Sequence, residues 1–178
     1  MVIRYYIKVK TQKQPLLGFR HWAIRNNKLG AATHHYEWEP GLNHANCHMG
    51  HEAPARDCHC GFNAYYCLED TTYGGVCGAI AGAGKVELHG DGFRSSEAQI
   101  IALLAVAPNK YNSYSSYYSK DELKEIEATY GVPVFTDKKE FLKYVRTKAK
   151  PIETFLPIFS KAKAFGKKNS HKSSYKLR

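Results

Sequence analysis

The sequence has no run of apolar residues long enough to cross a membrane, which takes about 18 consecutive residues. Its first ten residues contain neither a continuous apolar segment nor a small-residue cleavage site, so they do not read as a secretory signal. We therefore expect a cytoplasmic protein with no membrane partner. In that reducing compartment the five cysteines favour free thiols or metal ligands over disulfides.

Three well-understood catalytic or phosphate-binding motifs are also missing. A zinc deaminase needs H-x-E followed by P-C-x-x-C, whereas here Glu52 directly follows His51 and the later cysteines form a C-x-C pair. A zinc-protease helix needs H-E-x-x-H, but the second histidine is replaced by Ala55. The segment 84–86 (Gly-Lys-Val) lacks the earlier glycine and the Ser/Thr of a phosphate-binding loop.

Acidic residues are missing from the last 18 positions. The chain of 178 residues has 26 Lys/Arg and 16 Asp/Glu, for a net charge of +10. The final segment contributes seven of the basic residues, which leaves 19 against 16, or +3, for the rest. A tail this basic and this poor in apolar residues is typical of disorder and of phosphate binding. The candidate nucleic-acid contacts are Lys161, Lys163, Lys167, Lys168, Lys172, Lys176 and Arg178.

The most informative feature present is a group of cysteines and histidines within fourteen positions. Cys47, His51, Cys58 and Cys60 make a full ligand set for one tetrahedral zinc ion. The apolar content from 40 to 60 is low, so a metal would supply the ordering free energy that packing cannot. Four protein ligands leave no open position for water, which favours structural over catalytic zinc. Other donors compete with His51, namely His44, His48 and His59.

The remaining pattern predicts an α+β fold, with a small, strongly bent antiparallel sheet or partial barrel followed by two or three helices. Alternation or β-rich composition predicts strands, and Cys67 and Cys77 are expected to be buried within two of them. Helical spacing predicts three helices. The strand ranges are 2–10, 16–25, 34–38, 61–68, 76–81 and 85–89, and the helix ranges are 97–106, 121–130 and 137–146.

These elements suggest three parts of the chain. Residues 1–107 form a zinc-stabilised sheet domain with its closing helix. Residues 108–150 form a helical and extended extension packed on that domain. Residues 151–178 form the basic, disordered tail.

Two further segments are candidate binding surfaces. His89 and Arg94 flank a Gly-Asp-Gly turn and are candidates for binding an anion. The alternative is structural: Arg94 pairs with Asp91 or Glu97, or donates to backbone carbonyls. The tyrosine-rich loop from Tyr111 to Tyr118 is a candidate surface for stacking bases or for a protein partner, and an ordinary surface loop is the alternative.

Six segments of the chain form a distinctive pattern: Trp38-Glu39-Pro40-Gly41, Ala45-Asn46-Cys47, His51-Glu52-Ala53-Pro54, Cys58-His59-Cys60-Gly61-Phe62-Asn63-Ala64, Gly84-Lys85-Val86 and Gly92-Phe93-Arg94-Ser95. In these segments the chain resembles an uncharacterised family found in actinobacterial genomes and bacteriophages. The resemblance covers about 16–106 and implies that Cys47, His51, Cys58 and Cys60 act as a unit, but it brings no activity. The chain departs from the family pattern at Ser95.

The sequence thus predicts a non-enzymatic, zinc-stabilised binding module for nucleic acid or a nucleic-acid-associated protein complex. One alternative is a phage- or plasmid-borne factor that modulates a host complex through the tyrosine-rich loop. A second is an enzyme that acts on a nucleotide or phosphorylated substrate at the 89–94 turn.

Overall fold

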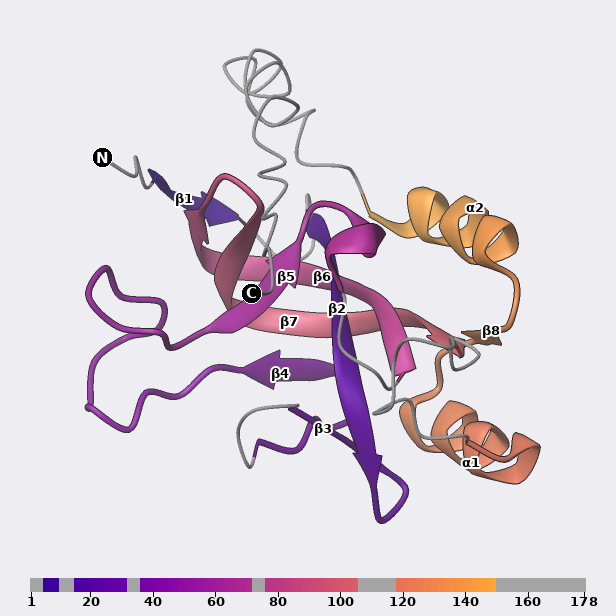
Figure 1. Cartoon of the computed structure of the whole chain (residues 1–178). Helices are drawn as coiled ribbons and strands as arrows, with labels where there is room; N and C mark the ends of the chain where they lie inside the picture. Colours follow the sequence, from indigo (N-terminus) through magenta and orange to yellow (C-terminus); the bar gives the residue numbers. More distant parts are fainter. Residues whose placement is uncertain (1–4, 10–14, 32–35, 72–75, 106–117, 150–178) are drawn as a thin grey trace, which may run out of the picture.

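The computed structural model describes residues 5–9, 15–31, 36–71, 76–105 and 118–149. Within these ranges the protein has the predicted α+β composition, with a sheet of eight strands and two α-helices (Figure 1). No helix in the described ranges is long and apolar enough to cross a membrane. The elements are β1 (Tyr5–Val9), β2 (Leu16–Arg25), β3 (Lys28–Gly30), β4 (Leu42–His44), β5 (Phe62–Tyr65), the 3-10 helix η1 (Leu68–Asp70), β6 (Val76–Leu88), β7 (Gly92–Ala105), α1 (Lys120–Tyr130), β8 (Val134–Phe135) and α2 (Lys138–Lys148).

The sheet is built around the long antiparallel hairpin of β6 and β7. Strand β6 also pairs with β1 and β2, and β7 pairs with β4, β5 and, in parallel, with β8. A single residue pair, Phe19 with Tyr65, joins β2 to β5, so that β2, β6, β7 and β5 each pair with the next and β5 pairs with β2 again. One residue pair is too little to close a barrel. The structure therefore has the predicted bent sheet but is not a clear barrel.

Small residues let the hairpin bend. The β6–β7 register shifts between Ala79 and Ile80 and again between Ala83 and Val86, as at β-bulges. A Cβ atom at Gly82 would lie 2.3 Å from the ring of Phe93, so only glycine lets that ring cross the strand. The segments 76–81 and 85–89, predicted as two strands, are therefore one bent strand.

The helix predicted over 97–106 is wrong, because the described part of this segment, 97–105, is the second half of β7. Ala98, Ile101 and Ala102 recur at helical spacing, but every residue of the segment from 100 onward is apolar, and periodicity alone cannot then separate a helix from a buried strand. The segment forms a strand because the apolar strand β6 pairs with β7 along most of the length of β7. Ser96, which directly precedes the predicted helix, accepts a hydrogen bond from the Lys85 amide of β6 at 2.8 Å.

The other two predicted helices are present as α1 and α2. Ser119 and Glu122 form a capping box at the start of α1, and Gly131 ends it in a left-handed conformation. Neighbouring residues of β2 alternate between two hydrophobic clusters, so the clusters lie on opposite faces of the sheet. Tyr130 of α1 belongs to one cluster and Phe141 of α2 to the other. The described residues of the predicted extension, 118–149, therefore pack into both hydrophobic clusters of the sheet.

Tyr130 ties three distant segments together. Its buried hydroxyl accepts a hydrogen bond from the Leu29 amide and donates one to the Trp38 carbonyl, both at 2.8 Å. Trp38 packs edge-on against Trp22 in the same cluster, with ring centroids 5.4 Å apart. The segment after β3 is therefore held by α1 as well as by the sheet.

The two cysteines expected inside strands have different environments. Cys77 is buried in β6, as predicted. Cys67 is exposed, because β5 ends at Tyr65 and Cys67 precedes the short helix η1 instead of continuing the strand. The strand predicted over 34–38 lies partly outside the described residues; its described end forms one bridge, Glu37 with Gly30.

Candidate metal centre

The candidate ligands lie in the long loop between β4 and β5, which we call the metal loop (residues 45–61). In Figure 1 it extends from the sheet on the side away from α1 and α2. Local turns shape it: the Gly50 amide donates to the Cys47 carbonyl at 3.0 Å, and the Cys58 amide donates to the Ala55 carbonyl at 3.2 Å. Gly61 has a φ of 105°, a left-handed value that glycine adopts without strain, where the loop enters β5.

The structure brings together the four predicted ligands, one donor atom from each lying within 4.8 Å of all the others. The Sγ atom of Cys47 lies 3.7 Å from that of Cys58 and 3.4 Å from Nε2 of His51. The Sγ atom of Cys60 lies 3.9 Å from Nδ1 of His51. Cys47, His51, Cys58 and Cys60 are thus close enough to bind one metal ion.

Among the four histidines near the cluster, only His51 contributes to it. Its Nδ1 lies 3.3 Å from the carbonyl oxygen of Glu52, a contact of the kind that orients a ligand ring and frees Nε2 for a metal. His44 lies 4.0 Å from the Glu97 carboxylate on β7, and His48 is exposed. His59 lines a neighbouring cavity.

The neighbouring thiols of the C-x-C pair have different acidities. Hydrogen bonds, chiefly from the Cys60 backbone, lower the pKa of the Cys58 thiol to about 7. Burial raises the pKa of the Cys60 thiol to about 11. Because a metal binds the thiolate form, an ion that uses both sulfurs must displace the Cys60 proton.

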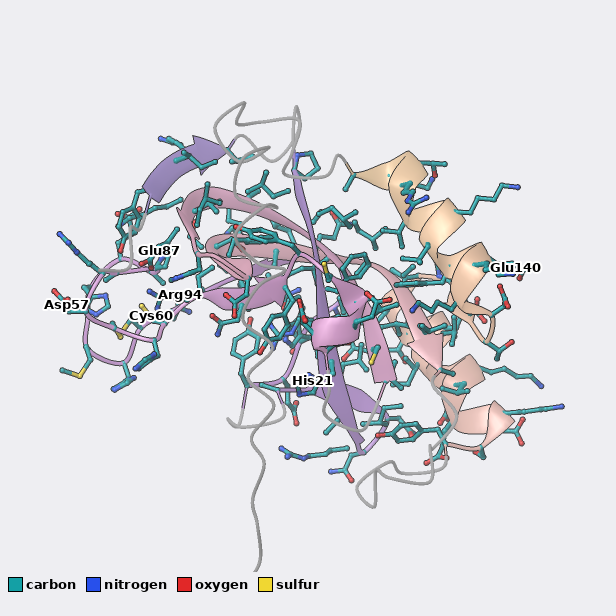
Figure 2. All side chains as sticks on the ribbon, turned by 45° about the horizontal axis from the view of Figure 1, so that its top comes forward. His21, Asp57, Cys60, Glu87, Arg94 and Glu140 are labelled. Atoms are coloured by element: carbon teal, nitrogen blue, oxygen red, sulfur yellow. The ribbon has the colours of Figure 1, made fainter. Side chains whose placement is uncertain are left out.

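Arg94 joins the metal loop to the sheet. This side chain is 5% exposed and donates to the carbonyl oxygens of Cys58, Cys60 and Ala55. The last two contacts are both 3.2 Å long. Two of these carbonyls belong to candidate ligands, so the guanidinium fixes the backbone from which both sulfurs of the C-x-C pair project. Figure 2 shows Arg94 near Cys60 and Glu87, where the metal loop meets the sheet.

The charge of Arg94 is balanced by Glu87, which is fully buried on the adjacent strand. The register places the two residues directly opposite each other in the β6–β7 ladder. The Nε–H of Arg94 donates to Nε2 of His89 at 3.3 Å, so each of the five guanidinium N–H groups has an acceptor. These contacts favour the structural role for Arg94 over anion binding, and the partner is Glu87 instead of the expected Asp91 or Glu97.

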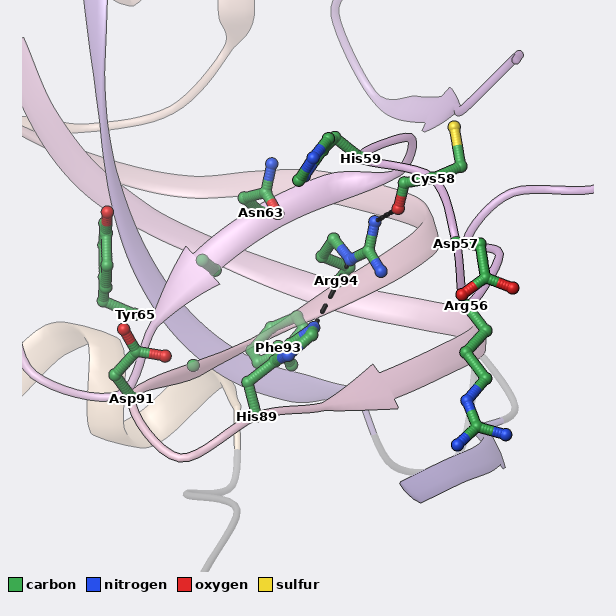
Figure 3. Close-up of a pocket in the computed structure, with 12 residues that line it drawn as sticks. Arg56, Asp57, Cys58, His59, Asn63, Tyr65, His89, Asp91, Phe93 and Arg94 are labelled. Carbon is green, nitrogen blue, oxygen red and sulfur yellow. Dashed lines mark hydrogen bonds between the residues drawn. The ribbon is translucent and has the colours of Figure 1, made fainter. Parts of the chain in front are cut away.

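A cavity of about 470 Å³ lies beside the metal loop. Residues 56–59 of the loop form one side, and the outward side chains of β5 and the turn from His89 to Gly92 form the others (Figure 3). The turn is held by the bond from the His89 amide to the Gly92 carbonyl at 2.8 Å. Tyr66 supports it, because its hydroxyl donates to the His89 carbonyl at 3.0 Å.

Two predicted surfaces fall largely outside the described residues. The basic tail from Lys161 to Arg178 lies there entirely, as do positions 111–117 of the tyrosine-rich loop. Tyr118, the last residue of that loop, is partly buried against the first hydrophobic cluster, and its hydroxyl accepts from the Ile24 amide at 3.4 Å. Tyr118 therefore contributes to the packing and hydrogen bonding of the fold.

No protein-family model, curated protein or solved structure matches this chain. The site is therefore interpreted from its own geometry.

Sequence reasoning missed Glu87 and the cavity. Glu87 is a lone carboxylate in a mostly apolar strand. A buried carboxylate almost always pairs with a cation, and this was the one local sign that Glu87 has a partner. The cavity has no such signal, since its walls come from two segments, 56–65 and 89–94, whose nearest ends lie 24 positions apart. Only strand register brings them together.

Proposed function

We propose that the protein is a non-enzymatic binding module in which a structural zinc ion orders the metal loop, and that its ligand is nucleic acid or a nucleic-acid-associated complex. The observation that carries the zinc assignment is the geometry of the four donors. Zinc–sulfur bonds of about 2.3 Å in a tetrahedron place two sulfurs about 3.8 Å apart. The distance between Cys47 and Cys58 is 3.7 Å.

Donor chemistry supports the same ion. Three thiolates and one imidazole form one of the common structural zinc sets, whereas calcium and magnesium prefer oxygen ligands. Four protein ligands complete the tetrahedron, so no position remains for a reacting water. The role that follows is mechanical: the ion holds a loop whose side chains at 56–59 form a surface.

Nucleic-acid binding is supported by the seven basic residues of the tail, Lys161, Lys163, Lys167, Lys168, Lys172, Lys176 and Arg178. Each phosphate that such a tail neutralises releases counterions, which makes the affinity fall as salt rises. If all seven basic residues contact a single strand, they contribute about −5 to the slope of log K against log salt.

The zinc proposal is tested by measuring the metal content of the purified full-length protein. We expect about one zinc per chain, lost together with cooperative unfolding in Cys58→Ser. Cys67→Ser is the matched control, because Cys67 is an exposed cysteine outside the cluster. A metal-free protein that unfolds cooperatively, or equal zinc loss in both variants, would refute the structural site.

The nucleic-acid proposal is tested by fluorescence anisotropy with single-stranded and duplex DNA and RNA over a range of salt. Removal of 161–178 should weaken binding and reduce the salt slope by up to about 5 for single strands and up to about 6 for duplex DNA. A full-length variant with the tail's basic residues changed to glutamine separates charge from length. If the intact protein binds none of these nucleic acids at low salt, the proposal fails.

One observation favours a second candidate, an enzyme that acts on a nucleotide: His89, Asp91 and Arg94 all line the cavity. The full set of internal contacts made by Arg94 argues against it. Incubation with nucleoside triphosphates and monophosphates, with His89→Ala as control, decides between the two. Turnover that disappears in the variant would replace the binding module with an enzyme.

A further inference from the structure

We propose that the cavity beside the metal loop binds an unstacked nucleobase. This inference rests on the proposed nucleic-acid function and assigns its base-reading site. The cavity lies on the outer face of β5 and β7, where Asn63 stands opposite Arg94 in the register and Tyr65 stands opposite Gly92. Its volume of about 470 Å³ lies within the usual range for small-ligand sites, roughly 300–1,000 Å³.

The charges around the cavity do not make an anion site. Arg56 and Arg94 line it together with Asp57 and Asp91, and Glu87 neutralises Arg94 from behind. A phosphate or a carboxylate would therefore meet more acids than arginines. The lining suits a neutral group that both donates and accepts hydrogen bonds, which describes the edge of a nucleobase.

Three polar side chains at the cavity are available to a ligand. Within the described part of the chain, His59, Asn63 and Asp91 make no side-chain hydrogen bond or ion pair. Figure 3 shows them around the same hollow, with His59 and Asn63 on one side and Asp91 across from them. By contrast, Arg94 is committed to the loop carbonyls and to Glu87.

Aromatic and amide groups border the cavity together. Tyr65 from β5 and the imidazoles of His59 and His89 provide flat ring faces, on which bases stack. The Asn63 amide offers one donor and one acceptor side, and the Asp91 carboxylate only accepts. A carboxylate only accepts, so it favours bases with an exocyclic amino group, namely adenine, cytosine and guanine. Thymine is disfavoured, because its one N–H donor lies between two carbonyl oxygens that repel the carboxylate.

The metal loop makes this site dependent on the metal. Cys58 is a candidate ligand and also lines the cavity, as do its neighbours Asp57 and His59. Figure 3 shows the Cys58 sulfur directed away from the hollow, so the ion would lie behind the wall and not inside it. Loss of the metal should therefore remove the preference among bases and leave the salt-dependent binding by the basic tail unchanged.

The test uses the full-length, metal-loaded protein and single strands of about twelve nucleotides, long enough for one site. We expect oligo(dA) and oligo(dC) to bind about tenfold more tightly than oligo(dT) at equal salt. Asp91→Asn and Asn63→Ala should reduce that preference to about twofold or less while the salt slope, set by the tail, stays unchanged. Asp70→Asn is the matched control, because Asp70 is an exposed aspartate that does not line the cavity.

A parallel titration with AMP, CMP and TMP, followed by thermal shift, identifies the source of the base. Stabilisation by AMP and CMP that is lost in Asp91→Asn supports the base site, even if strands do not bind and the proposed function fails. Strand binding with equal affinity for all three oligonucleotides, unaffected by either cavity variant, overturns the base site and leaves the nucleic-acid function standing. No response to strands or mononucleotides overturns both.

Discussion

Replacing Arg94 with methionine is the most direct perturbation of the link between the sheet and the metal loop. Methionine keeps most of the side-chain volume and removes all five guanidinium N–H donors of Arg94. The change leaves Glu87, which is fully buried, without its countercharge. It also removes the donors to the carbonyls of Ala55, Cys58 and Cys60.

Two costs set the size of the effect. Breaking a buried ion pair by removing one partner costs about 3–5 kcal/mol. The three loop carbonyls can turn to water, since the metal loop is largely exposed, so their loss adds roughly 1 kcal/mol at most. We therefore expect about 3–6 kcal/mol of destabilisation, a large share of the roughly 5–15 kcal/mol of a typical domain. Loosening the backbone of two ligands should also weaken metal binding about 10- to 100-fold.

The assay is urea unfolding at fixed zinc, together with competition against a chelating dye for metal affinity. Lys138→Met is the matched control, since Lys138 also forms an ion pair, with Glu69, but both side chains are about half exposed or more. That variant should lose no more than about 1 kcal/mol and bind metal normally. Arg94→Lys keeps the charge but cannot reach all the acceptors, so it should fall between wild type and Arg94→Met.

Adding Glu87→Gln to Arg94→Met should recover part of the lost stability, because the double variant no longer buries a lone carboxylate. The reasoning is refuted if Arg94→Met costs less than about 1 kcal/mol, or if the double variant is no more stable than the single one. Metal affinity that is equal in wild type and Arg94→Met would refute the positioning role separately.

Three further changes test the fold by equilibrium unfolding. Tyr130→Phe should cost about 1–3 kcal/mol, because two buried backbone groups lose their partner; a smaller loss would mean that water replaces the hydroxyl. Gly82→Ala should cost about 1–3 kcal/mol against the buried ring of Phe93, whereas Gly90→Ala, with open space around it, should cost almost nothing. Burial lowers the pKa of His21, so this group's stabilisation is present above about pH 6.5 and is lost as pH falls below it. His21→Gln should therefore lose less stability than wild type between about pH 7 and 5, and identical profiles would contradict this.

The segments that the sequence predicted well are those whose structure depends on near neighbours. The helix predicted over 121–130 is present as α1, which spans 120–130. The contacts that bound it are local, since Ser119 caps it with Glu122 and Gly131 ends it. Because α1 and α2 each have one buried and one exposed side, their apolar residues recur at helical spacing in the sequence. The 97–106 segment is apolar from 100 onward, so its period carried no information about its partner, and a strand was read as a helix.

The same division holds for the candidate site. Cys47, His51, Cys58 and Cys60 lie within fourteen positions, so chain connectivity alone keeps their donors near one another. The sequence left three other histidines as alternatives to His51, and only the structure separated them from the cluster. Their attachment to the sheet was decided by the β6–β7 register, which sets Glu87 opposite Arg94. The cavity was decided in the same way, by the β5–β7 register and the turn after β6. Register depends on which strands pair across long stretches of chain, and that pairing follows from burying two faces of one sheet at once, which no local pattern specifies.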